Sequence, residues 1–240
     1  MRIVVLTTET PHHGYFVHQV SKEFPLEAVF VETRIPRPAF DAYHPFEDER
    51  DEYERQVFFG GKNSRMRDFR PTFEVGSCND SDAVARIKGI NPEFIIVFGT
   101  GKLSNEVISV CPHAIINLHG GDPEKYRGLD THLWAIYHGD FQQLIATLHH
   151  LNEDLDDGAI ILQASVPIEA GVRLHQLRQL NTNVCITLAL SAIDMYSRHR
   201  AFVSRPQRKM GRYYSFMPAA LKEICRCRFE RYTEGLNANS

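Results

Sequence analysis

The sequence predicts an α/β protein with a Rossmann-like, doubly wound, mostly parallel sheet, helices on both faces and a small C-terminal extension. Short apolar segments rich in Val and Ile alternate with segments of helical periodicity, the pattern of parallel strands joined by helices. The 240 residues, 43% of them hydrophobic, are enough for one sizeable core. Two of the apolar segments run directly into polar residues and glycines, as expected at the carboxyl edge of such a sheet.

Strands are expected wherever the apolar runs are short. The strands at residues 2–6 and 26–32, with a helix at 14–24 between them, make a βαβ unit whose crossover should be right-handed. Further strands are expected at residues 73–75, 94–98, 115–119, 144–151 and 159–166. The link between the last two is short enough for an antiparallel return.

The remaining helices are predicted by apolar residues spaced three and four apart. Residues 46–59 show this spacing among many charges, and Gly60 and Gly61 end the helix. Residues 172–196 repeat it over a longer stretch and predict a long packing helix. Shorter helices are expected at 81–90, 104–109 and 129–138, and a terminal hairpin or strand at 211–216.

The composition argues against several classes of protein. No apolar run approaches the roughly 20 residues that cross a bilayer, and Thr7, Thr8 and Glu9 interrupt the N-terminal run before it resembles a signal peptide. Five cysteines without a Cys-x-x-Cys pair are typical of idle thiols in a reducing compartment. We therefore expect a cytoplasmic protein that has no membrane partner.

Basic residues gather in the C-terminal part of the chain, from Arg198 to Arg231. A nucleic-acid site would use such a surface, but no stacking aromatic motif or known nucleic-acid module accompanies it, so a solvated or oligomer-facing surface is the better interpretation. The histidines are scattered, without a His-x-x-x-His and acid set, so no metal site is predicted. Neither a nucleic acid nor a metal ion is expected as a partner.

Polar residues end the predicted strand at 115–119. Asn117 and His119 occupy alternate positions, so their side chains face the same side of the sheet edge. Gly120 and Gly121 follow at once and let the backbone turn sharply near a ligand. Taken singly, an amide and an imidazole at a strand end are usually structural, whereas an added acid makes them a candidate proton-transfer site.

The acid is expected from the loop that joins the last two strands. Residues 151–163, LNEDLDDGAIILQ, place Asp156 in an acidic loop between two apolar runs. His149 and His150, on the strand before it, are interpreted as strand residues, one facing inward and one outward. Neighbouring loops would then bring a carboxylate, a carboxamide and an imidazole together.

This arrangement resembles the folate-dependent formyltransferase family, and most closely the short sugar N-formyltransferases. The resemblance covers roughly residues 95–168 and rests on residues in the family's order: Asn117, His119, Tyr126, Arg127, Gly128, Thr131, His132, Trp134, Thr147, His149, Leu155, Asp156, Gly158 and Gln163. It implies a catalytic domain over residues 1–200. Residues 201–240 would be a small extension, a hairpin or helix, used for dimer or substrate contacts.

The resemblance implies transfer of a formyl group from N10-formyltetrahydrofolate, the cosubstrate, to a primary amine. Attack on the formyl carbon makes an oxyanion, which the Asn117 amide or a protonated His119 would stabilise. His119 would also carry the proton from the amine to the folate nitrogen. Asp156, the third implied catalytic residue, would orient the imidazole and favour its charged form.

The resemblance also implies which residues surround the two substrates. The folate pocket would be lined by Gly99, Gly101, Lys102 and Leu103, together with Asp154 and Leu155. For the loop that begins at Gly99, a plain strand-to-helix turn is an equally good interpretation of the sequence alone. On the acceptor side we expect His12, His13, Tyr15, Gly120, Gly121, Arg127 and Tyr213.

Two features that the sequence lacks limit which amine is expected to accept the formyl group. Phosphoribosylglycinamide formyltransferases have a Gly-rich phosphate loop after the first strand, whereas residues 7–15, TTETPHHGY, hold one glycine. The chain is also too short for the added domain with which methionyl-tRNA formyltransferases hold tRNA. We therefore expect a nucleotide-linked amino deoxysugar as acceptor, and a homodimer. The alternatives are another small amine, of the amino acid type or glycinamide ribonucleotide, and a non-catalytic folate-binding homologue.

Overall fold

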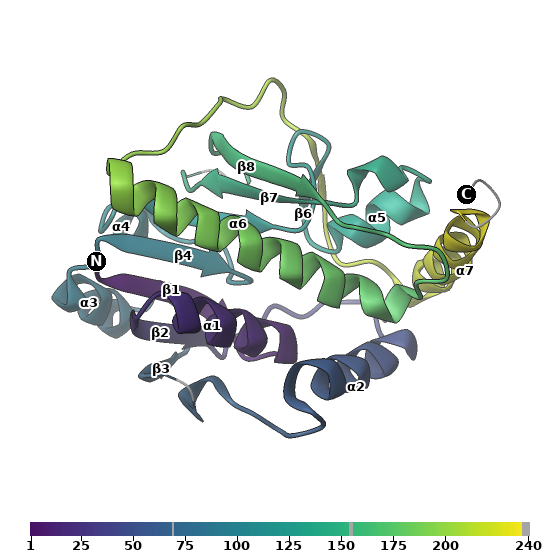
Figure 1. The fold of residues 1–240 in the computed structure, drawn as a ribbon, viewed down its shortest axis with the longest axis horizontal. Coiled ribbons are helices and arrows are strands. Elements are labelled where there is room, and N and C mark those ends of the chain that lie inside the picture. The colour runs from purple at the N-terminus through teal and green to yellow at the C-terminus, as the bar shows by residue number, and fades with distance from the viewer. Residues whose placement is uncertain (69, 154–155, 237–240) are drawn as a thin grey trace.

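The computed structural model describes residues 1–68, 70–153 and 156–236 of the chain. Its centre is a seven-stranded sheet in the order β3-β2-β1-β4-β5-β7-β8 (Figure 1). The strands are β1 (Ile3–Thr8), β2 (Leu26–Glu32), β3 (Thr72–Val75), β4 (Phe94–Phe98), β5 (Ile115–His119), β7 (Ile145–His150) and β8 (Ile160–Ser165). β7 pairs antiparallel with β5 and β8 while the other pairs are parallel, which confirms the predicted fold class.

Helices cover both faces of this sheet. They are α1 (Pro11–Glu23), α2 (Phe46–Phe59), α3 (Ser81–Ile90), α4 (Asn105–Ile108), α5 (Thr131–Tyr137), α6 (Leu177–His199) and α7 (Ala219–Leu236). In Figure 1, α6 crosses in front of the sheet and packs against α1, whereas α3 and α4 lie on the other face. The strand order reverses between β1 and β4, so the carboxyl ends of the strands flank a switch point of the kind where ligands bind. Within the described ranges, no helix combines the length and the apolar character that a membrane crossing requires.

Two apolar clusters hold these layers together. The larger lies between the sheet and its helices, where β1 and β4 are buried along their whole length, as continuous apolar runs predict. The smaller unites residues of α2, α5, α6 and α7, among them Phe46, Ala135, Leu177 and Phe229. Burying one such large side chain stabilises the fold by roughly 1.5–3 kcal/mol, so α7 is anchored to the body of the protein.

The first helix begins earlier than the sequence analysis placed it. Pro11 occupies the first helical position and the Thr10 side chain accepts a hydrogen bond from the His13 N–H, an N-terminal cap. The predicted start at residue 14 was three residues late because this Thr-Pro signal was not used. His12 and His13 consequently lie in the first turn of α1 and not in a loop.

The C-terminal segment does not form the predicted hairpin. β9 (Arg212–Tyr214) pairs in parallel with β6 (Tyr126–Gly128), and the two make a separate small sheet. Arg205, earlier in the same segment, bridges to Ile160 of β8. Of the two alternatives expected for residues 211–216, the strand is confirmed and the hairpin is not, because the C-terminal segment pairs with β6 and β8 and not with itself; α7 follows it.

Candidate active site

Asn117 and His119 lie at the carboxyl end of β5, inside the sheet. β4 flanks β5 on one side and β7 on the other, with His149 directly opposite Asn117. Residues two apart on a strand point to the same side, so the amide and the imidazole face a common space. His119 is buried and Asn117 is partly buried.

The structure brings Asp156 to these two side chains. The Asn117 Nδ2 donates to Asp156 Oδ1 at 3.4 Å, and His119 Nδ1 lies 3.6 Å from the same oxygen. The other oxygen, Oδ2, accepts a hydrogen bond of 2.9 Å from the Gly128 N–H. Asp156 is buried and has a left-handed backbone with φ of 53°, a conformation that Asp tolerates better than most residues. The three predicted catalytic residues therefore share one place.

The hydrogen bonds of His119 fix its tautomer. Its Nε2 lies 2.8 Å from the Tyr126 carbonyl oxygen, which can only accept, so Nε2 carries a proton and donates. In the neutral ring, Nδ1 then faces the Asp156 carboxylate with its lone pair. Protonating Nδ1 gives a cation that has an acceptor in front of each nitrogen, the Tyr126 carbonyl at Nε2 and the Asp156 carboxylate at Nδ1.

The participation of His149 in this site was not predicted from the sequence. Its Nδ1 lies 2.7 Å from the His150 carbonyl oxygen and therefore donates to it, which leaves Nε2 as an acceptor. Nε2 accepts the Asn117 Nδ2–H at 3.1 Å and lies 3.6 Å from Asp156 Oδ1. The available signal was its position among the residues that carry the family resemblance, but the register that places it opposite Asn117 follows only from the β5–β7 pairing.

The charge of Asp156 follows from these neighbours. Burial alone would raise the pKa of the Asp156 carboxyl. The charge of His119, the interactions with His149 and the Gly128 N–H outweigh burial, so the pKa lies well below its usual range. The group is a carboxylate at neutral pH.

Glu32, at the end of β2, holds the loop that was predicted to line the folate pocket. Its buried carboxylate accepts hydrogen bonds from the Ser77 hydroxyl, the Cys78 N–H and the Gly101 N–H at 2.9, 2.7 and 3.0 Å. This role was not predicted from the sequence, where Glu32 is simply the last residue of an expected strand. The Glu32 carboxylate therefore holds the backbone of this loop in place.

The predicted folate-side residues themselves differ in exposure. Gly99 has φ of 84°, and a Cβ atom there would lie 2.3 Å from the His13 ring, so only glycine fits. Gly101 and Lys102 are exposed, whereas Leu103 is buried in the core. The predicted Asp154 and Leu155 lie outside the described residues.

The predicted acceptor-side residues His12, His13 and Tyr15 lie on the first turns of α1. The His13 Nδ1 is 2.9 Å from the Thr8 hydroxyl, and its ring packs edge-on against Phe98 at the end of β4. Burial lowers the pKa of His12 well below its ordinary value and lowers that of His13 to about 3, with Arg178 contributing to both. Both imidazoles are therefore uncharged at neutral pH. Tyr15 stacks on Phe58 of α2 at 4.1 Å between ring centroids.

The other predicted acceptor-side residues lie around the turn after β5 and on the small sheet. A Cβ atom on Gly121 would lie 3.3 Å from His119 Nε2, so this glycine lets the chain pass close to the imidazole. Gly120 accepts a hydrogen bond from the Thr131 hydroxyl through its carbonyl. Arg127 is buried in β6, and Tyr213 in β9 is 56% exposed.

Chemically, this group of side chains is suited to moving a proton next to a developing negative charge. It offers an amide donor, an imidazole that can gain and lose a proton, and a permanent carboxylate. Among the residues described here, no three His, Cys, Asp or Glu side chains are arranged to hold a metal ion.

A doubly wound sheet with an amide, an imidazole and a carboxylate at the end of a central strand defines an α/β protein with a polar site at the carboxyl edge of its sheet. Comparison with known families gives the particular one: the formyl transferase family matches residues 1–184, more than half of the chain. The chain belongs to the formyl transferase family.

Individual relatives agree with this placement. A methionyl-tRNA formyltransferase from Thermodesulfovibrio yellowstonii is 31% identical over 125 residues, which are 52% of this chain and 40% of the relative. The chain thus spans less than half of that relative's length. Two solved structures share the fold. A sugar N-formyltransferase from Shewanella has a TM-score of 0.60 and 14% identity, and the match covers 95% of this chain and 87% of that one. Glycinamide ribonucleotide transformylase 1 from Symbiobacterium toebii has a TM-score of 0.59 and 19% identity, and the match covers 86% of this chain and 93% of that one.

Proposed function

We propose that the protein transfers a formyl group from N10-formyltetrahydrofolate to the primary amine of a nucleotide-linked amino deoxysugar. The observation that carries the proposal is that Asp156 Oδ1 lies 3.4 Å from Asn117 Nδ2 and 3.6 Å from His119 Nδ1 at the end of β5. These are the residues that the family resemblance implied as catalytic, and they come from segments 37 or more positions apart in the chain, 119 to 156.

The proposed reaction uses each side chain for one task. The amine nitrogen attacks the formyl carbon, and the carbonyl oxygen becomes an oxyanion. His119 takes the proton from the attacking nitrogen and gives it to N10 of the folate as the bond between the formyl carbon and N10 breaks. The products are a formamide and tetrahydrofolate, and the Asp156 carboxylate stabilises the imidazolium while it exists.

Asn117 is the proposed donor to the oxyanion. In the structure its N–H groups point to His149 Nε2 at 3.1 Å and to Asp156 Oδ1 at 3.4 Å. The second bond is long for an N–H···O contact and therefore the weaker one. The proposal is that the oxyanion replaces this second contact, while the bond to His149 keeps the amide in place.

The loop braced by Glu32 supports the folate side of the proposal. Gly99 and Gly101 bring the main chain to the surface without side chains, which suits the approach of a flat ring system. The carboxylate of Glu32 holds the Gly101 N–H, so the loop is fixed before any ligand arrives. Gly99, Gly101, Lys102 and Leu103 are the proposed folate contacts.

The start of α1 supports an acceptor other than glycinamide ribonucleotide. A phosphate at a helix N-terminus needs free N–H groups and is helped by cations. Here the His13 N–H is given to the Thr10 hydroxyl and the Gly14 N–H to the Thr10 carbonyl. The neighbouring imidazoles of His12 and His13 are uncharged, so they are proposed to contact the sugar and not a phosphate. Tyr15, Arg127 and Tyr213 are the proposed contacts for the nucleotide.

The test is formyl transfer by the purified chain. The protein is incubated with N10-formyltetrahydrofolate and separate nucleotide-linked 4-amino-deoxysugars, an amino acid and glycinamide ribonucleotide, and formylated product is measured by mass spectrometry. We expect product from an amino sugar and none from glycinamide ribonucleotide. Product from glycinamide ribonucleotide or the amino acid alone contradicts the acceptor assignment, and absence of product with every amine contradicts the activity.

Two variants distinguish turnover by the candidate active site from turnover by a contaminating enzyme. His119→Gln removes the proton carrier and should lower turnover by about a hundredfold or more. His113→Gln changes an exposed histidine just before the start of the same strand and should leave turnover unchanged. Equal turnover in the two variants contradicts the proposed role of His119.

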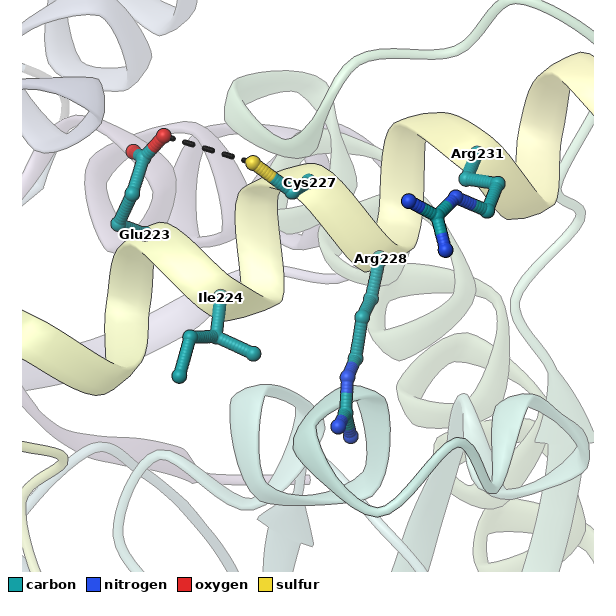
Figure 2. Close-up of a pocket in the computed structure, with 5 residues that line it drawn as sticks. All are labelled: Glu223, Ile224, Cys227, Arg228 and Arg231. Atoms are coloured by element: carbon teal, nitrogen blue, oxygen red, sulfur yellow. Dashed lines mark hydrogen bonds between the residues drawn. The ribbon is translucent and has the colours of Figure 1, made fainter.

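We further infer that the protein forms a homodimer. Figure 2 shows part of α7, where a surface hollow of about 280 Å³ is lined by Glu223, Ile224, Cys227, Arg228 and Arg231. Ile224 is 39% exposed there, and no residue of the candidate active site lines this hollow. Light scattering during size-exclusion chromatography should give twice the chain mass; the mass of one chain at all concentrations contradicts the dimer.

A further inference from the structure

The segment between α6 and α7 is tied to both loops that build the candidate active site. Arg205 exchanges two backbone hydrogen bonds with Ile160, of 2.8 and 2.9 Å. Its guanidinium donates to the Glu124 carboxylate at 2.8 Å and to the Gln163 side chain at 3.1 Å. Residue 205 is therefore fixed between β8 and the loop that follows β5.

A second set of bonds fixes the other end of the segment. The Gly211 N–H donates to the Pro123 carbonyl and the Arg212 N–H to the Lys125 carbonyl, each at 3.1 Å. A Cβ atom on Gly211 would lie 2.4 Å from the Pro123 oxygen, so the two chains touch here. β9 then runs beside β6, whose Tyr126 carbonyl accepts the hydrogen bond from His119.

Between these two fixed points lies Gln207, which reaches the backbone of the Asp156 loop. Its Nε2 donates to the Asp156 carbonyl at 2.8 Å and to the Gly158 carbonyl at 3.0 Å. The first carbonyl belongs to the residue whose φ is left-handed, and the second lies two residues later. The chain at Gly158 passes so close to β7 that a Cβ atom would lie 1.7 Å from the His150 oxygen. A left-handed non-glycine residue has to be held by its surroundings, and Gln207 is in contact with it.

The orientation of the Gln207 amide indicates that these two bonds decide its position. Its Oε1 is buried and has no hydrogen-bond partner in the part of the chain that the structure describes. Leaving a buried acceptor unmatched costs free energy. Turning the amide over would put Oε1 against the two carbonyl oxygens, which repel it. The observed orientation therefore keeps the Nε2 hydrogen bonds to the Asp156 loop and leaves Oε1 without a partner among the described residues.

We propose that Gln207 is a positioning residue that holds the backbone of Asp156, so that the carboxylate stays between His119 and His149 and keeps its bond to the Gly128 N–H. Through Gln207, the C-terminal extension thus helps to place the catalytic carboxylate. The role in turnover rests on the proposed function, whereas the role in placing Asp156 does not.

The first test is amide hydrogen exchange, followed by NMR, in Gln207→Leu, which keeps the side-chain size and removes the donors. In the wild type the Gly128 N–H is bound by Asp156 Oδ2, and the Leu129 N–H next to it is bound by the Tyr214 carbonyl at 2.9 Å. We expect Gly128 to exchange about tenfold faster in the variant, the equivalent of one net hydrogen bond, with Leu129 unchanged. Lys209→Leu, at an exposed position in the same segment, should leave both amides unchanged.

Two outcomes of this exchange experiment overturn the proposal. If Gly128 exchanges at the wild-type rate in Gln207→Leu, Gln207 does not hold the carboxylate in place. If Gly128 and Leu129 accelerate alike, Gln207 merely keeps β9 paired with β6. Neither outcome depends on the enzyme being active, so failure of the proposed function is recognised separately by the absence of product from the wild type.

The second test is kinetic. In Gln207→Leu, kcat for formyl transfer should fall about tenfold while KM for both substrates changes by less than about twofold. The reason is that a displaced Asp156 stabilises the transition state less well but leaves the substrate-binding surfaces unchanged. In an Asp156→Asn background the Gln207→Leu change should have a much smaller effect, since its target is gone. Equal effects in the two backgrounds contradict action through Asp156.

Discussion

Asp156 keeps a negative charge in a buried place because every neighbour of its side chain is a donor or a potential cation. His119, His149 and the Gly128 N–H lie on different sides of the carboxylate. Because these contacts exist only in the folded chain, the folded pKa lies below the unfolded one. Asp156 therefore links stability to pH.

Replacing Asp156 with Asn should remove this link. A group with a lowered folded pKa stabilises the protein above its unfolded pKa, and this contribution disappears as the pH falls. We expect the free energy of unfolding of the wild type to fall between about pH 5 and pH 2, and that of Asp156→Asn to fall less. Urea unfolding at a series of pH values measures this. Asp157→Asn, at the next position, should keep the wild-type slope; the same slope in all three proteins contradicts the assignment.

His149 offers a second prediction for a single residue. His149→Leu removes the acceptor that holds the Asn117 amide, so kcat for formyl transfer should fall by about tenfold or more. The control is His150→Leu, since the neighbouring ring packs against Phe202 on the other side of the strand. Steady-state kinetics distinguishes the two. An unchanged kcat in His149→Leu shows that Asn117 needs no support.

How much of the site could be predicted depends on where each residue gets its partners. Asn117, His119 and Asp156 were proposed from the sequence because each belongs to a local pattern, a strand end or an acidic loop. His149 and Glu32 act through partners 32 and 69 positions away, Asn117 and Gly101. Such contacts depend on strand register and loop packing, which local patterns do not specify.

At the scale of single elements, the small sheet of β6 and β9 helps to position the side chains of His119 and Asp156. β6 provides the Tyr126 carbonyl for His119 and the Gly128 N–H for Asp156. Gly128 has φ of 92°, and a Cβ atom there would lie 2.2 Å from the Tyr214 carbonyl oxygen of β9. The pairing of β6 with β9 therefore requires glycine at this position.

Gly128→Ala should consequently cost more stability than an ordinary glycine substitution. Gly139→Ala is the matched control, because Gly139 also has positive φ, 72°, but nothing lies within 4 Å of its Cβ position. Both variants should lose roughly 1–2 kcal/mol for the left-handed backbone, and Gly128→Ala should lose more because β9 has to move away. Chemical unfolding compares them, and equal losses contradict the close pairing.

The loop after β4 gives a further prediction at this scale. Glu32→Gln replaces one carboxylate oxygen by an N–H₂ group, so one of the three bound donors loses its acceptor. KM for N10-formyltetrahydrofolate should rise about tenfold while kcat stays within about twofold. Glu27→Gln, at an exposed position of the same strand, is the control. A changed kcat with an unchanged KM contradicts a role in folate binding.

Strands and helices of the main sheet were predictable because their patterns are local: continuous apolar runs for β1 and β4, helical spacing for α2 and α6. The end of the chain was not, because β9 pairs with residues more than 80 positions earlier, Arg212 with Tyr126. A segment of three residues has too little pattern of its own to reveal such a partner.

For the whole molecule, buried uncharged histidines are a source of sensitivity to acid. Burial lowers the pKa of His132 to about 4, against its hydrogen bond to the Ile145 carbonyl, and it lowers those of His12 and His13 as well. The unfolded chain binds protons on these groups at about pH 6.5, and the folded chain does not. Lower pH therefore favours unfolding.

We expect stability to be highest above about pH 6.5 and to fall by about 1.4 kcal/mol per pH unit for each such histidine as the pH approaches 4. His132→Asn should reduce the dependence of the unfolding free energy on pH by the share of one histidine. His113→Asn, at an exposed site, should leave this dependence unchanged. Urea unfolding between these pH values measures both slopes. A wild-type stability that is constant over this range contradicts the burial of the uncharged rings.

The path of the chain through the small sheet has a consequence for biosynthesis. Since a ribosome makes the chain from the N-terminus, the sheet strands, Asn117, His119 and Asp156 all leave the exit tunnel before Arg205, Gln207 and β9. A growing polypeptide can fold its main sheet at that stage, but the bonds that the last segment gives to Asp156 and β6 do not yet exist. Catalytic competence should therefore be acquired only after Arg205, Gln207 and β9 have left the tunnel.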